Sequence, residues 1–257
     1  MNILVLKLIL APVIIGSASL AGRRWGPAVS GWIVGMPLTS GPVIFFVALS
    51  HSTAFAANAA LGVLSGGLSL VAFTITYSWL AVKFRWQVAI VGSLLVFATS
   101  TMILQNFIFP LLPIFVMVCI VLVLGLRLMP KDIAIPESED KPGKWDIPFR
   151  ILIGTSFILL LTGIAPLIGS RLTGLLTTIP LYVTILTVFA HRHQGPAAAA
   201  HVLRGLLYGM FAFTGFFIVL SPLIEKTSLA ISFGAAILTA LIIQGSSLLI
   251  LNLMHRK

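Results

Sequence analysis

The sequence predicts an all-α polytopic membrane protein of about nine transmembrane helices, built from two inverted-topology repeats of four helices each. Three observations lead to this fold class: the composition, the number of long apolar segments and an internal repeat. Of the 257 residues, 59% are hydrophobic and only 9% are charged, and the mean hydropathy is +1.13. A soluble domain carries about 25% charged residues, so the composition indicates a chain embedded in a lipid bilayer.

Apolar segments of about 20 residues, which is the length of a helix that crosses a bilayer, occur nine times. They are expected near residues 3–20, 28–49, 54–82, 86–109, 111–128, 149–168, 173–190, 198–222 and 229–253. The first segment could pass for a secretory signal. However, Lys7 lies within it, and Arg23 and Arg24 follow it as they would on the retained side of a membrane anchor. The polar segment 130–148 holds five of the six acidic residues and is expected to be a solvated linker.

When the sequence is shifted by 143 residues, Gly31 falls on Gly174, and the stretch from Gly31 to Ser78 aligns with the second half of the chain without a gap. About 13 identities occur over the 48 positions from Gly31 to Ser78, more than this composition gives by chance. The same offset also pairs Pro37 with Pro180, Gly62 with Gly205 and Gly66 with Gly209. We therefore expect a first repeat over 1–109, a linker span and loop over 110–148, and a second repeat over 149–257.

The basic residues predict the orientation of the helices, since cytoplasmic loops are enriched in lysine and arginine. With nine spans and the N-terminus outside, 13 of the 16 basic residues are cytoplasmic or at that border, and only Lys7, Arg171 and Lys226 lie outside. The two repeats start five spans apart, and because five is odd they enter the membrane in opposite directions. Inverted repeats of this kind are typical of secondary transporters. A miscount of one span would make the repeat parallel.

Prolines near the middle of the second and seventh segments predict interrupted helices. Proline lacks a backbone donor and clashes with the preceding turn, and freed backbone groups in a membrane need protein or water as partners. We expect Pro37 and Pro180 to line one cavity near the bilayer midplane, where hydroxyls and unwound backbone would bind a solute. Interhelical hydrogen bonding by these hydroxyls is the structural alternative. The candidate substrate-binding residues are Gly35, Pro37, Thr39, Ser40, Gly41, Thr177, Thr178, Pro180, Tyr182 and Thr184.

A second group of candidates carries charge or polarity near the ends of the spans. His201 and Arg204 lie three residues apart at the cytoplasmic start of the eighth segment, and Asn58 is the residue that aligns with His201. They are candidates for gating, with simple extension to the membrane surface as the alternative. No aspartate or glutamate falls within any expected span, which argues against coupling through a buried carboxylate and favours a neutral or anionic solute. No catalytic or phosphate-binding motif is recognised, so we expect neither an enzyme nor a cofactor or metal.

The segment GLLTTIPLYVTILTVFAHRHQG, from Gly174 to Gly195, resembles the small four-span GlpM family of bacterial inner-membrane proteins. The similarity covers roughly Phe149 to Lys257 and reaches the first half only through the internal repeat. It implies a bacterial inner-membrane protein linked to envelope or exopolysaccharide production. The doubled length departs from that family, and it would suit a fusion of two copies that otherwise pair as antiparallel subunits.

These observations lead to a functional hypothesis and one alternative. We expect a secondary transporter or permease that moves a small neutral or anionic solute, lipid-linked solutes included, by alternating access. It would lie in the bacterial inner membrane with the N-terminus outside and the C-terminus cytoplasmic. The expected partners are the lipid bilayer and the solute, with no nucleic acid despite the net charge of +10, and a homo-oligomer is left open. The alternative is a non-transporting membrane subunit of an envelope or exopolysaccharide assembly system.

Overall fold

A computed structural model of the chain describes residues 3–24, 27–130 and 146–254. These residues form ten helices and no strand, which confirms the all-α class. Most of the expected linker over 130–148 lies outside the described residues. The helices are α1 (Ile3–Arg24), α2 (Pro27–Val34), α3 (Ser40–Ser50), α4 (Thr53–Lys83), α5 (Trp86–Leu104), α6 (Leu111–Leu128), α7 (Asp146–Ile168), α8 (Ser170–Leu176), α9 (Leu181–Leu223) and α10 (Leu229–Met254).

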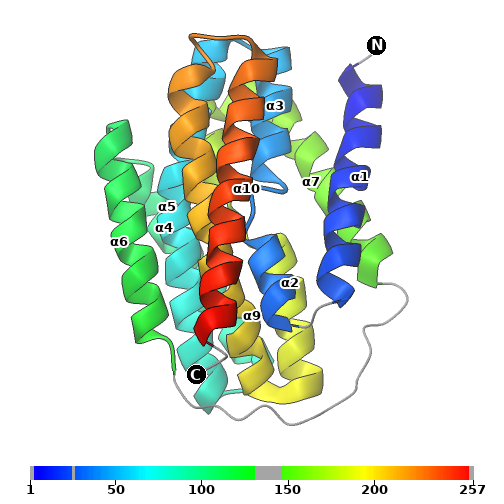
Figure 1. Ribbon diagram of the computed structural model, residues 1–257, viewed down its shortest axis with the longest axis vertical. Coiled ribbons are helices and arrows are strands. Elements are labelled where there is room, and N and C mark those ends of the chain that lie inside the picture. The colour runs from blue at the N-terminus through cyan, green and yellow to red at the C-terminus, as the bar shows by residue number, and fades with distance from the viewer. Residues whose placement is uncertain (1–2, 25–26, 131–145, 255–257) are drawn as a thin grey trace.

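The helices form an elongated bundle whose centre is made by α4 and α9 (Figure 1). Both contribute many fully buried side chains, including Phe73 and Tyr77 from α4 and Phe217 from α9. The outer helices α5, α6 and α10 instead expose large apolar side chains such as Leu95, Leu112 and Leu241. Large exposed apolar surface is unfavourable in water but is expected where lipid surrounds the chain.

Six helices of the described chain are long and apolar enough to cross a membrane. Together with the apolar outer surface, they make this a helical membrane protein of the multi-pass type. Hydroxyl groups are concentrated inside the bundle: Ser69, Thr74 and Ser78 of α4 are buried. Thr74 and Ser78 each donate to the carbonyl four residues earlier. Helical backbone and such local bonds keep polar groups satisfied away from water.

Two of the nine expected segments are each divided into separate helices. The segment expected over 28–49 consists of α2 and α3, and the segment expected over 173–190 consists of α8 and the start of α9. The divisions fall at Pro37 and Pro180, where the missing proline donor predicts them. The seventh and eighth expected segments join at Gly195, whose φ of 86° is non-helical and marks a kink within α9.

The helix bounds recur at a constant interval along the chain. Helices α1, α2 and α5 begin at Ile3, Pro27 and Trp86, and helices α7, α8 and α10 begin at Asp146, Ser170 and Leu229. Each of the second three starts aligns with one of the first three at the offset that places Gly31 on Gly174.

The packing recurs with exchanged partners, because α2 packs against α9 while α8 packs against α4. Helix α6 has no counterpart and packs against both α4 and α9. In Figure 1, α1 descends from the N-terminus at the top, whereas α7 begins near the bottom and runs upward. Helices α1 and α7 thus run in opposite directions in this view.

Candidate binding site at two interrupted helices

The first interruption separates α2 from α3 over residues 35–39. Regular helical bonding ends where the Gly35 N–H donates to the Gly31 carbonyl at 2.9 Å. The next two bonds span only three and two residues, from the Met36 and Leu38 N–H groups. Helical bonding resumes when Gly41 donates to the carbonyl of Pro37, also at 2.9 Å. The unwound turn therefore presents backbone groups that a continuous helix would have used internally.

The second interruption, between α8 and α9, repeats this backbone pattern. Leu181 donates to the carbonyl of Ile179 at 2.8 Å, as Leu38 does to Met36 at 2.7 Å. Thr184 then donates to the carbonyl of Pro180 at 2.9 Å, which restores helical bonding. Each of these bonds joins the residues that align with its counterpart in the first interruption. The two proline-containing turns therefore adopt the same local structure.

Glycines bring the two interruptions into backbone contact with the central helices. A methyl group built on Gly31 would overlap the backbone oxygen of Val202, and one built on Gly174 would overlap the backbone oxygen of Ala59. Ala59 and Val202 are themselves aligned by the repeat, so the same contact occurs twice with its partners exchanged. Small residues at helix interfaces permit this close approach in membranes. Here they fix α2 on α9 and α8 on α4.

A second contact between an interrupted helix and a central helix, about one turn further along α2 and α8, also occurs twice with its partners exchanged. A methyl group on Gly35 would lie 2.7 Å from the Cα atom of Gly209, and one on Gly66 would overlap the Thr178 side chain. The sequence motif that pairs Gly62 with Gly66 therefore packs on α8 and the turn after it, and Gly209 packs on α2. Close packing is the role that the glycine spacing predicts. It places the C-terminal ends of α2 and α8 near each other at the centre of the bundle.

A small cavity of about 40 Å³ lies where the two interruptions meet. It has room for roughly one water molecule. Seven of the ten candidate substrate-binding residues line it: Gly35, Thr39, Ser40, Thr177, Thr178, Pro180 and Tyr182. The described conformation thus gathers most of the candidates but leaves no space for a solute among them.

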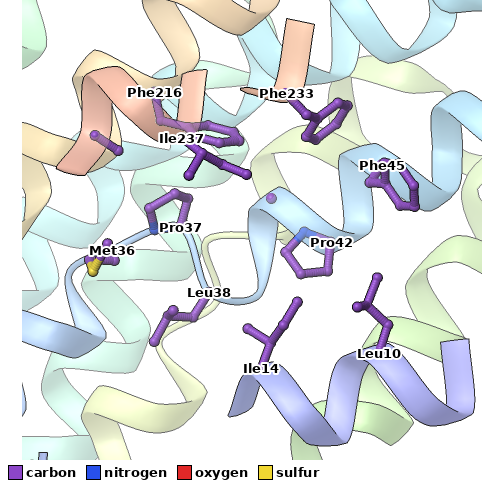
Figure 2. Close-up of a pocket in the computed structure, with 12 residues that line it drawn as sticks. Leu10, Ile14, Met36, Pro37, Leu38, Pro42, Phe45, Phe216, Phe233 and Ile237 are labelled. Atoms are coloured by element: carbon purple, nitrogen blue, oxygen red, sulfur yellow. The ribbon is translucent and has the colours of Figure 1, made fainter. Parts of the chain in front are cut away.

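A much larger cavity, of about 340 Å³, opens beside the first interruption. Figure 2 shows Leu10 and Ile14 of α1 on one side and Phe216 and Ile237 on the other, with the interrupted turn between them. Every residue that lines it is apolar: Leu10, Ile14, Met36, Pro37, Leu38, Gly41, Pro42, Phe45, Phe216, Phe233, Ile237 and Ala240. An apolar space of this size sits within the range of small-molecule sites, about 300–1,000 Å³.

In the described conformation, Pro37 and Pro180 line different cavities of the two described above, so their shared cavity stays a prediction. Pro180 lines the small cavity, whereas Pro37 and Gly41 line the large one, and Met36 borders both. The side chains at equivalent positions of the two halves also differ. Gly41 of the first half corresponds to Thr184 in the second, and Ile14 corresponds to Phe157. Thr184 itself lines neither cavity.

The hydroxyl groups near the second interruption fall into two sets. Thr177 and Thr178 each donate to a carbonyl three residues earlier, Gly174 and Leu175, at 2.7 Å. Such local bonds satisfy the hydroxyl hydrogen and leave the oxygen lone pairs available. By contrast, the buried hydroxyls of Thr184 and Thr187 have no hydrogen-bond partner in the described part of the chain.

Two buried hydroxyl residues near this region were not among the candidates. Thr155 of α7 and Thr187 of α9 each bury a hydroxyl without a partner among the described residues. The sequence offered no signal for them, because threonine is common in membrane helices and burial depends on tertiary packing. An unpaired buried hydroxyl costs about 1–3 kcal/mol, but neither residue lines either cavity.

The charged and polar candidates lie away from both cavities. Arg204 donates from Nη2 to the carbonyl of Pro130 at 3.0 Å, and Asn58 is exposed and donates to the carbonyl of Ala54 at 3.0 Å. His201 is half-buried on α9. None of the three lines either cavity, so a gating role for them stays a prediction.

One partly buried basic group was not among the candidates. Lys7 of α1 donates from Nζ to the Thr162 hydroxyl of α7 at 2.7 Å, and its Nζ lies 5.6 Å from the ring centroid of Phe46. Thr162 in turn donates to the carbonyl of Ile158 at 2.7 Å. The described residues give Lys7 no carboxylate partner. Its charge is balanced only by a hydroxyl and an aromatic face.

Comparison of the chain with protein-family models, with curated proteins and with solved structures finds no match in any of the three.

Proposed function

We propose that the chain is a secondary transporter or permease for a small neutral or anionic solute, and that it works by alternating access. The observation that carries the proposal is the meeting of the two interrupted helices, with exchanged packing partners, at one polar cavity. Interrupted helices near the membrane midplane are the usual binding elements of secondary transporters, because their unwound backbone and helix ends contact solute.

An inverted repeat is part of the proposal. Counting each interrupted helix as one span gives nine: α1, α2 with α3, α4, α5, α6, α7, α8 with the first part of α9, the rest of α9, and α10. The constant interval between helix starts and the opposite directions of α1 and α7 in Figure 1 support two copies related by an axis in the membrane plane. Two such halves can exchange conformations, which opens a central site to each side in turn.

The proposed location is the bacterial inner membrane, with the N-terminus outside and the C-terminus cytoplasmic. The two termini lie at opposite ends of the bundle in Figure 1, as an odd number of spans requires. The excess of basic residues assigned to one side supports the direction. The chemistry of the solute rests on the lining residues, since neither cavity contains a carboxylate.

Two-sided access to the small cavity tests the proposal without knowledge of the solute. Cys119 of α6 is the only cysteine of the chain, so Cys119→Ala provides a background for Ser40→Cys and Thr178→Cys. Vesicles of both orientations would be treated with a small membrane-impermeant thiol reagent. We expect both cysteines to react from either side, while the vesicles remain impermeable to the reagent.

Reaction from one side only, in every condition, would overturn alternating access. So would a leak of the reagent across the membrane, since this would indicate a continuous pore. If the cysteines never react and the chain always purifies in a fixed ratio with a partner, the assembly subunit becomes the better description. Lys226→Cys, in the exposed turn between α9 and α10, serves as the control for reagent activity.

A further inference from the structure

The large cavity differs from the small one in size and in polarity. It holds about 340 Å³ of space and is lined by apolar side chains alone. An apolar cavity of roughly 150 Å³ is enough to bind benzene, so this one has room for about a dozen carbon atoms. Its walls offer no hydrogen-bonding side chain, so the part of a ligand that it accepts is a hydrocarbon chain.

Lys7 does not line this cavity, but it lies about one helical turn before Leu10, which does. Lys7 is three residues before Leu10 and seven before Ile14, so all three lie on one face of α1. The Lys7 Nζ approaches Phe46, whose ring centroid lies 5.6 Å from that of Phe45, and Phe45 lines the cavity. The described residues provide no carboxylate that would neutralise this charge. A cation without a counter-charge in an apolar setting favours an anionic partner from a ligand.

We infer that the large cavity binds the hydrocarbon chain of a single-chain anionic amphiphile whose carboxylate is held by Lys7. This inference rests on the proposed transport function and names the class of its substrate. The interrupted turn from Met36 to Gly41 forms the cavity wall, and Met36 also borders the small polar cavity. Movement of that turn during alternating access would therefore act on the bound chain.

At three of the positions that correspond to this cavity the other half carries larger side chains, whereas Phe45 and Phe233 correspond to the smaller Val188 and Ile90. Gly41, Ile14 and Ala240 correspond to Thr184, Phe157 and Phe97, and all three replacements are larger. Phe97 is buried. Gly41 can accept a side chain without strain, since a Cβ atom there would lie 3.6 Å from Phe216 and 3.8 Å from Pro37. A larger side chain at position 41 would therefore extend into the cavity.

The test uses photolabelling of the purified full-length chain in lipid nanodiscs. The probe is a twelve-carbon carboxylate with a diazirine near the end of its chain, and labelled peptides are identified by mass spectrometry. We expect label on the parts of α1, α3 and α10 that line the cavity. Unlabelled dodecanoate should compete about tenfold better than dodecanol, and butyrate should not compete, because it lacks the hydrocarbon chain.

Two pairs of variants test binding of the hydrocarbon chain separately from recognition of the carboxylate. Gly41→Leu should abolish labelling, whereas Gly234→Leu on α10 should leave it unchanged, because no atom lies within 4 Å of a Cβ built there. Lys7→Gln keeps a donor for Thr162 and should remove the preference for dodecanoate over dodecanol, whereas Lys7→Arg should retain it. The elution profile and melting temperature of each variant report on folding.

Equal competition by dodecanoate and dodecanol in the unmodified chain would overturn the anionic specificity and leave a space for ordinary lipid tails. Label outside the cavity, or undiminished label in a folded Gly41→Leu variant, would overturn the site. The result is independent of the access test at Ser40. Labelling without two-sided access refutes transport but not binding, and two-sided access without labelling refutes only the substrate class.

Discussion

Gly31 of α2 lies against the backbone carbonyl of Val202 in α9, with no room for a side chain between them. We predict that Gly31→Ala and Gly174→Ala, which disturb equivalent contacts, each destabilise the protein by about 1–3 kcal/mol, the usual cost of overpacking. Thermal unfolding in detergent measures the change. Gly163→Ala on α7 is the matched control, because a methyl group there meets nothing within 4 Å. Unchanged stability of both buried variants would contradict the close contact.

Replacement of either interrupting proline by alanine should change access to the small cavity more than it changes the stability of the fold. Pro37→Ala and Pro180→Ala restore a backbone donor and favour a continuous helix, so the melting temperature should fall little or rise. Reaction of the Ser40→Cys and Thr178→Cys cysteines should nevertheless become slower from both sides, because straightened helices close the cavity. Lower stability with unchanged cysteine reactivity would instead identify these prolines as structural kinks.

The direction of insertion predicts opposite exposure for two lysines. Lys83 ends α4 and Lys226 follows α9, and both are exposed. In the Cys119→Ala background, Lys226→Cys should react with an impermeant reagent added outside intact cells, and Lys83→Cys should react only after the membrane is opened. Reaction of both cysteines in intact cells would contradict the proposed topology.

Replacement of Thr162 tests the hydrogen bond made by the partly buried Lys7 ammonium. Thr162→Val preserves shape but removes the acceptor of the 2.7 Å bond from Lys7. Loss of a hydrogen bond to this partly buried ammonium costs about 1 kcal/mol, and unfolding measurements should show a loss of this size. Thr162→Ser keeps the hydroxyl and should lose much less. Equal losses in the two variants would show that the methyl group, rather than the bond, matters.

The helices themselves could be predicted because hydrophobic length and proline act locally. The expected segment 111–128 coincides with α6, and the expected interruptions at Pro37 and Pro180 fall just after the ends of α2 and α8. Both signals depend on residues close together in the chain. These signals therefore do not depend on which tertiary contacts form.

The division of the site into two cavities could not be predicted in the same way. The space beside Pro37 is lined by residues of α1, α3, α9 and α10 together with the turn between α2 and α3. The burial of Thr155 and Thr187 also depends on which helices meet. These properties arise from contacts between segments that are distant in the sequence. The internal repeat predicts which backbone positions are equivalent, but it does not predict how much space the side chains leave between helices.

The difference between Gly41 and Thr184 has a consequence for how duplicated proteins specialise. Each of these residues donates the first helical bond after its proline turn, to the carbonyl of Pro37 or of Pro180. The backbone can thus stay matched while the side chains along it differ, as Gly41 and Thr184 do. A large cavity can then be present beside one turn and absent beside the other without any change in the path of the chain.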